Sequence, residues 1–130
     1  MNHRRQALKR GIEGEAFVAR VLRSWGWEVL HERWHCRWGE LDIVAREPAA
    51  GEDILVFVEV KARTRAGDWD PRLAVTPTKQ QRLWRTAEQF LMAHEAYAAY
   101  PCRFDVALVR CRAASGGHRL QQYFKGAFEG

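Results

Sequence analysis

Hydrophobic and polar residues along the chain follow two different periods. From Gln6 to Trp25 the apolar residues recur with a period of roughly 3.6, as on one face of a helix, and Gly26 then supplies a stop signal. A second pattern of this kind begins at Thr76 or Thr78, because Thr76-Pro77 resembles an N-cap followed by proline at the first helical position. We expect this second helix to continue until Pro101. The pattern therefore predicts two helices.

The other apolar segments are short and rich in β-branched residues, which is typical of strands. We predict strands over residues 27–34, 40–46, 54–62, 104–111 and 120–124. The third is so hydrophobic that it should be central and buried on both faces, whereas the last is short and should lie at an edge. In the second strand, Leu41, Ile43 and Ala45 alternate with their neighbours and should share one face. The order α-β-β-β-α-β-β predicts an α/β fold with a central mixed sheet flanked by helices.

Length and composition agree with one globular domain over residues 1–130. The chain is 47% hydrophobic and 28% charged, and no run approaches the ~20 apolar residues that cross a membrane. The basic N-terminus lacks the apolar stretch of a secretory signal. The cysteines are Cys36, Cys102 and Cys111, an odd number without C-x-x-C spacing, so we expect a reducing, cytoplasmic setting without disulfides or a zinc ribbon.

The cationic side chains suggest a polyanionic partner. The net charge is +5, and 17 of the 21 cations are arginines, whose planar guanidinium matches phosphate. Lys79, Arg82 and Arg85 recur every third residue near the start of the second helix, where they could meet the backbone of DNA. A solvated helix face explains the same spacing.

Six tryptophans add candidate stacking groups. We expect Trp25, Trp27 and Trp84 to belong to the core or its edge. The other three lie in or beside predicted loops and could stack on exposed bases; they are Trp34, Trp38 and Trp69.

Ionisable residues interrupt the most hydrophobic strand. Glu59 and Lys61 project from one face of it, and burying such charges costs several kcal/mol per ion unless they are paired or bind a metal. If the preceding strand forms a hairpin with this one, Asp42 lies across from Glu59. Two carboxylates and a strand carbonyl can hold a divalent ion for phosphodiester hydrolysis, with lysine offsetting charge on the phosphate. A plain cross-strand salt bridge explains the spacing equally well.

Several motifs together resemble the uncharacterised YraN-like protein family, whose pattern is similar to that of Holliday-junction resolvases in the PD-(D/E)XK nuclease superfamily. The matching segments are Gly14-Glu15 with Ala16 and Ala19, Gly39-Glu40-Leu41-Asp42, Phe57-Val58-Glu59-Val60-Lys61 with Arg63, Ala74-Val75 with Lys79, Ala87 with Phe90-Leu91, Arg103-Phe104-Asp105-Val106 and Ala127-Phe128. One departure is the absence of an asparagine shortly before Gly39, where Arg33-Trp34-His35 stands. The resemblance covers almost the whole chain.

The resemblance implies a restriction-endonuclease-like fold and a site for Mg²⁺ or Mn²⁺. Asp42 and Glu59 would be metal ligands together with the Val60 carbonyl, and Lys61 would be the catalytic lysine. Glu15 would be an additional catalytic carboxylate, although a solvated or capping role is an alternative, and Glu40 would have a structural role. Arg63, with Lys79 and Arg82, would contact nucleic acid.

We therefore expect a DNA-binding protein that acts as a metal-dependent, resolvase-like endonuclease on branched or single-stranded DNA, without a membrane partner. Action on two strands would favour a homodimer. The first alternative is a non-catalytic DNA-binding module that keeps the nuclease fold and acts with a partner protein. The second is a structural protein in which Asp42, Glu59 and Lys61 form a buried ion network.

Overall fold

The computed structural model describes residues 3–64, 75–112 and 116–129. Its elements are helix α1 (His3–Ser24), strands β1 (Glu28–Cys36), β2 (Gly39–Glu47) and β3 (Ile54–Arg63), helix α3 (Pro77–Ala93), the short 3-10 helix η1 (Glu95–Tyr97), and strands β4 (Cys102–Cys111) and β5 (His118–Phe128). The predicted order of helices and strands is confirmed. Trp69 and Ala74 lie outside the described residues. No helix in the described part of the chain is long and apolar enough to span a membrane.

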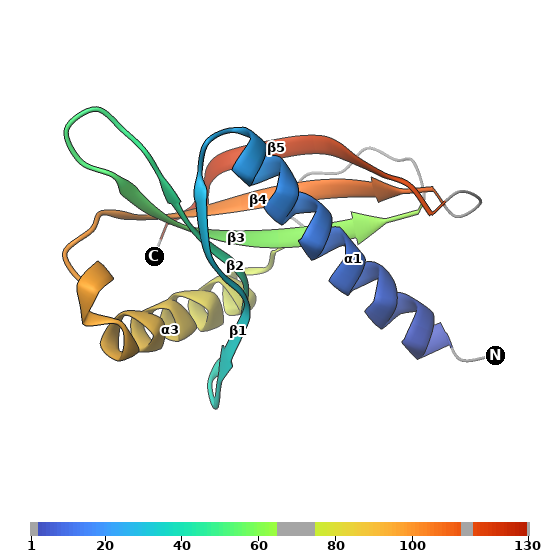
Figure 1. The fold of residues 1–130 in the computed structure, drawn as a ribbon. Helices are drawn as coiled ribbons and strands as arrows, with labels where there is room; N and C mark the ends of the chain where they lie inside the picture. The colour runs from blue at the N-terminus through green and yellow to red at the C-terminus, as the bar shows by residue number, and fades with distance from the viewer. Residues whose placement is uncertain (1–2, 65–74, 113–115, 130) are drawn as a thin grey trace.

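The strands form one mixed sheet in the order β1-β2-β3-β4-β5 (Figure 1). Strands β3 and β4 are parallel, and the other neighbours are antiparallel. Helix α1 crosses one face of the sheet and α3 covers the other, so the predicted α/β architecture is confirmed. Strand β3 occupies the centre, as its hydrophobicity predicted.

Alternation along β3 explains the two cores. Val56 and Val58 pack under α1, whereas Leu55 and Phe57 pack against α3. Successive strand residues point to opposite faces, so a strand covered on both sides must be apolar throughout. The α1 core includes Val18, Ala19 and Leu22, and the α3 core includes Leu83, Ala87 and Phe90.

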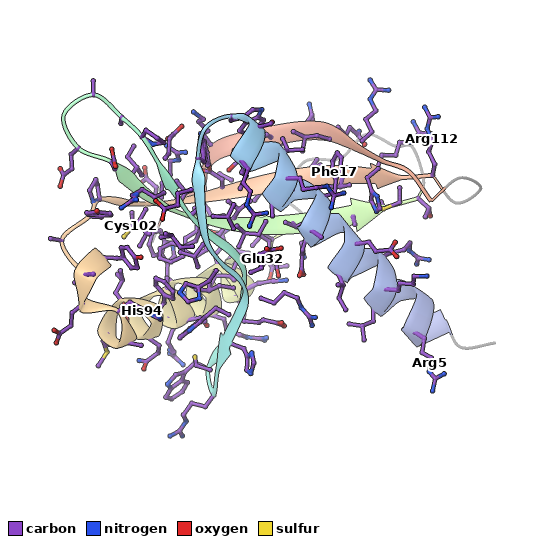
Figure 2. The ribbon with its side chains drawn as sticks, in the orientation of Figure 1. Arg5, Phe17, Glu32, His94, Cys102 and Arg112 are labelled. Carbon is purple, nitrogen blue, oxygen red and sulfur yellow. The ribbon has the colours of Figure 1, made fainter. Side chains whose placement is uncertain are left out.

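Helix α3 begins as predicted but ends earlier. Thr76 accepts a hydrogen bond from the Lys79 backbone N–H, and Pro77 follows it as the first helical residue. The helix ends at Ala93 rather than near Pro101. His94 lies at this end (Figure 2), where its ring Nδ1 is 2.8 Å from the Phe90 carbonyl and its backbone N–H donates to Leu91. The His94 ring therefore occupies the Phe90 carbonyl, which would accept a backbone N–H if the helix continued.

Strand β5 is at the sheet edge as expected, but it runs from His118 to Phe128 and is longer than predicted. Its C-terminal part is held by a side chain of β4, because the Gly126 N–H donates to Asp105 at 2.9 Å. The pairing of β4 with β5 shifts register near this point. A polar edge strand fixed by a distant carboxylate gives little local signal in the sequence.

The predicted alternation of β2 is wrong at Leu41. Ile43 and Ala45 pack in the α1 core, but Leu41 packs in the α3 core together with Val44. The alternation of β2 side chains between the two faces of the sheet is therefore interrupted between Leu41 and Ile43. Asp42 is the residue at this change.

Candidate active site

The candidate site lies where β2 and β3 separate. The last paired residues are Ile43 and Val58, and the strands diverge beyond them. The Asp42 carboxylate fills the gap, since its Oδ2 accepts a hydrogen bond of 2.8 Å from the Val60 backbone N–H. Apolar side chains line the small cavity beside this carboxylate, and they include Leu83, Phe57 and Phe104. Asp42 thus lies at a fork between two strands.

Glu59 lies beside Asp42, as the hairpin predicted. It is only 6% exposed, and burial alone would make its charge costly. The compensating groups are the Asp42 carboxyl and two lysines, one of which, Lys79 on α3, has its Nζ 3.3 Å from Glu59 Oε2. The second is Lys61, two residues along β3. The predicted grouping of Asp42, Glu59 and Lys61 is therefore present.

Glu15 reaches the same fork from α1. Gly14 makes this possible, because a Cβ at that position would lie 3.0 Å from the Ala62 Cβ. The helix axis can therefore approach β3 closely, and Glu15 is brought within hydrogen-bonding reach of Asp42. Its Oε2 is buried and has no hydrogen-bond partner. The structure thus adds a third carboxylate where the sequence predicted one.

The three carboxylates cannot all be ionised at such close range. Burial raises the pKa of Asp42 well above its usual value, and the hydrogen bond and negative charge of Glu59 raise it further. Burial also raises the pKa of Glu59, but the hydrogen bond with Asp42 and the charges of Lys79 and Lys61 outweigh it and lower that pKa overall. We therefore place the shared proton on Asp42.

The lysines respond to the same surroundings. Burial lowers the pKa of Lys61, and its neighbour Lys79 lowers it further. For Lys79, burial acts in the same direction, but the charges of Glu59 and Asp42 and the hydrogen bonds with Lys61 and Glu59 together outweigh it, and the pKa is raised overall. Lys79 is thus the counterion of Glu59, and the pKa of Lys61 is shifted in the opposite direction.

Comparison with known proteins places this chain in a family. The model of the uncharacterised protein family UPF0102 matches residues 14–109. The chain belongs to this family. The matched region contains every residue that we predicted for catalysis, metal binding or nucleic-acid binding.

Curated UPF0102 relatives cover most of the chain. The protein of Trichodesmium erythraeum is 51% identical over 82% of this chain and 64% of its own length. That of Acaryochloris marina is 48% identical over 88% of this chain and 70% of its own length. A Synechococcus relative is 50% identical over 92% of this chain and 90% of its own length. The chain thus spans slightly less than two thirds of the first of these relatives.

The donor set of the UPF0102 chain fits a hard divalent cation that keeps part of its water shell. Among the described residues, no three His, Cys, Asp or Glu side chains are arranged to hold a metal ion by themselves. Mg²⁺ rarely needs such a cage, because it commonly binds one or two carboxylates plus water and substrate phosphate. The Oε2 atoms of Glu15 and Glu59 are suitable ligands, because each is buried and accepts no hydrogen bond, although each lies in an ion pair. Val60 joins the site through its N–H, and the role of its carbonyl stays a prediction.

Arg33 is a site residue that sequence reasoning missed. Its Nε lies 3.5 Å from Glu15 Oε2 and 3.8 Å from Glu40 Oε1, so it bridges the helix and β2. Its φ is 55°, in the left-handed region that asparagine adopts more readily than arginine. The departure noted in the sequence, arginine in the stretch where asparagine is expected, was the available signal.

The residues predicted to bind nucleic acid separate into two groups. Lys79 lies inside the carboxylate cluster rather than only on a solvated helix face. Arg82 is exposed one turn further along α3, and Arg63 is exposed at the end of β3. Their contacts with DNA stay predictions.

A second buried acid near the sheet centre differs from this cluster. Asp105 is fully buried, but Arg103 donates to it twice and the Tyr123 hydroxyl and the Gly126 N–H donate once each. Its hydrogen-bonding capacity is thus used within the protein. Asp105 is a structural residue that ties β4 to β5.

Proposed function

We propose that this UPF0102 protein binds DNA and hydrolyses phosphodiester bonds with a divalent metal, as a resolvase-like endonuclease, and that its fold is restriction-endonuclease-like. The observation that supports this best is the convergence of Asp42, Glu59 and Lys61 at the fork between β2 and β3. The two carboxylates supply anionic oxygen donors, and the partly desolvated lysine supplies a positive charge beside them.

Each side chain has a distinct task in this proposal. Asp42 and Glu59, with the Val60 carbonyl, would hold Mg²⁺ or Mn²⁺. Such an ion would supply Lewis-acid chemistry at the phosphate. Lys61 donates hydrogen bonds to the attacking water or to the phosphate as negative charge grows there. Glu15 orients the water through its carboxylate, and Lys79 keeps Glu59 ionised.

Charge supports DNA as the substrate. The chain carries a net charge of +5, and Arg82 and Arg85 are exposed on α3, the helix that also supplies Lys79. Phosphate contacts of this kind position a duplex or a single strand without reading its sequence. A strand laid along α3 would thus pass the carboxylate cluster.

A second candidate is a DNA-binding module without catalysis, which keeps the nuclease fold and acts beside a partner protein. It is favoured by the Lys79–Glu59 ion pair, since a carboxylate held by lysine is a weaker metal ligand. Both candidate functions use the same DNA-binding surface, and they differ in whether the bound DNA is cleaved.

Single-turnover cleavage separates the candidates. A labelled junction, a flap and a single strand are incubated with Mn²⁺ and either wild type, Lys61→Met or Lys125→Met. Lys125 is the matched control, because it pairs with Glu47 in a different cluster. We expect Lys61→Met to bind DNA normally and to cleave about a hundredfold more slowly, with the control unchanged.

Two results would contradict parts of this proposal. If wild type binds a substrate and cuts none, the catalytic step is wrong and the binding module remains. If Lys61→Met cuts as fast as wild type, Lys61 is structural.

A further inference from the structure

The turn between β1 and β2 exposes an aromatic residue. Trp38 is 41% exposed, although it is one of the largest apolar side chains of the protein. The hairpin tip that contains it extends away from the body of the sheet (Figure 1). The other candidates differ, since Trp34 packs against Phe90 with ring centroids 5.3 Å apart. Trp38 is therefore the described tryptophan of this group that remains available to a ligand.

Two arginines from different elements flank this ring. The Arg37 guanidinium carbon lies 4.9 Å from the Trp38 ring centre, and that of Arg85 lies 5.4 Å from it. Both arginines are exposed. A guanidinium stacked on an indole can be replaced by a base and can then contact the adjoining phosphate. An aromatic ring between two cations is thus suited to a nucleotide.

The hairpin tip is held firmly against α3. Gly39 lies so close to the helix that a Cβ there would be 2.8 Å from the Thr86 hydroxyl oxygen. Thr86 is itself buried, and its hydroxyl donates to the Arg82 carbonyl. The backbone next to Trp38 is therefore packed on α3, and a preorganised backbone reduces the entropy lost when a ligand binds.

The ring is also near the candidate active site. Trp38 lies in the turn directly before β2 and precedes Asp42 by four residues, so the Cα atoms of the two residues are at most about 14 Å apart. About four nucleotides of a DNA strand, at roughly 3.4 Å each, cover that distance. A strand with its phosphate at Asp42 could thus place a base on Trp38.

We propose that Trp38, with Arg37 and Arg85, is a stacking site for an unpaired DNA base beside the catalytic fork. This inference rests on the proposed function and names its substrate class: DNA with unpaired bases near the cleaved phosphate, not continuous duplex. Inside a duplex the base faces are covered by neighbouring pairs, whereas a single strand or a branch exposes them. The arginines supply phosphate contacts, and the indole selects unpaired structure.

Equilibrium binding without divalent metal tests this site separately from catalysis. The probes are a short single-stranded DNA with a fluorescent purine analogue that is quenched by stacking, and the blunt duplex of the same sequence. The proteins are wild type, Trp38→Ala, Trp38→Phe and Trp25→Ala. Trp25 is the matched control, since it is 44% exposed but packs on Trp27 and Tyr123 away from α3.

We expect Trp38→Ala to weaken single-strand binding by about five- to one-hundred-fold and to abolish the quenching, because each stacked base contributes on this scale. Binding of the blunt duplex should change by less than about twofold. Trp38→Phe should keep most of the affinity and the quenching, and Trp25→Ala should match wild type. Thermal unfolding of each variant verifies that it is folded.

The outcomes distinguish the two proposals. If wild type binds single strands and Trp38→Ala binds them equally well, or loses duplex binding to the same extent, the stacking site is wrong and the proposed function stands. If wild type binds neither DNA at low salt, both are wrong. If Trp38→Ala instead converts a dimer into a monomer in sedimentation, the ring contacts a second copy of the chain and the stacking site is wrong.

Discussion

Replacing each of two aspartates of the sheet by asparagine should have opposite effects on stability. Asp42 and Asp105 both lie within the sheet, and the change from carboxylate to carboxamide keeps the volume nearly constant. Asp105 accepts hydrogen bonds from four donor groups, whereas Asp42 accepts one from the Val60 N–H and has the carboxyls of Glu59 and Glu15 as neighbours. The sign of the effect therefore reports whether each acid is structural.

The cost at Asp105 follows from its partners. Arg103 Nε and Nη2 lie 2.7 and 3.0 Å from its oxygens, and the Tyr123 hydroxyl lies at 2.6 Å. An amide group would turn an N–H toward one of these donors and would remove the charge that balances Arg103. Breaking a buried pair costs about 3–5 kcal/mol, and we expect the lower end because Arg103 keeps Glu47. That is a large part of the roughly 5–15 kcal/mol of a typical domain.

At Asp42 we expect a change between about zero and 1 kcal/mol in the stabilising direction without metal. The amide oxygen can still accept from Val60, and the new N–H group can donate to Glu59 in place of a shared proton. Proteins commonly keep such destabilising groups at functional sites.

Urea unfolding followed by circular dichroism, in EDTA and then in Mn²⁺, measures both effects. With Mn²⁺ about a hundredfold above its dissociation constant, wild type should gain about 2.7 kcal/mol and Asp42→Asn much less. If Asp42→Asn loses as much stability as Asp105→Asn in EDTA, Asp42 belongs to a structural ion network. The candidate site would then have to be abandoned.

Three further predictions follow from the same structure. In calorimetry, Glu59→Gln should lose the heat of Mn²⁺ binding that wild type and Glu47→Gln retain; equal heats would exclude Glu59 as a ligand. Burial raises the pKa of Glu47, but hydrogen bonds from Lys125 and Arg103 lower it overall. The contribution of Glu47 to the free energy of unfolding should therefore be present at neutral pH and lost as the pH falls through this lowered pKa, below 4.5. Glu47→Gln should flatten this acid limb of the stability curve, and an unchanged limb would refute the assignment. Arg82→Ala should reduce the log–log salt slope of duplex binding by about 0.9, whereas an unchanged slope would remove Arg82 from the interface.

Local signals account for the parts of the fold that could be predicted. The β-branched run of residues 54–62 requires two covered faces, and Thr76-Pro77 specifies a helix start through one backbone hydrogen bond. Asp42 and Glu59 could be paired because a short connection between alternating strands leaves few registers. The observed pairing of Ile43 with Val58 places them next to each other.

The remaining features depend on contacts between distant segments. Lys79 reaches Glu59 because α3 packs on the sheet, and nothing in the spacing of cations along that helix indicates which of them points inward. The turn of Leu41 toward α3 needs the strands to separate at Asp42. Arg33 enters the site through an unusual backbone conformation, which periodicity does not encode.

The difference between the two kinds of buried acid supports a ligand from outside the chain. A sheet that needed charge only for its own stability would satisfy each oxygen, as it does at Asp105, because unpartnered buried oxygens cost free energy. At the fork, Glu15 and Glu59 each keep a buried oxygen without a hydrogen bond, although Arg33 and Lys79 lie 3.5 and 3.3 Å away. These two oxygens are thus held by ion pairs alone, whereas the Asp105 oxygens accept hydrogen bonds. A divalent cation would use these acceptor positions, and a phosphate beside Lys61 would complete its coordination.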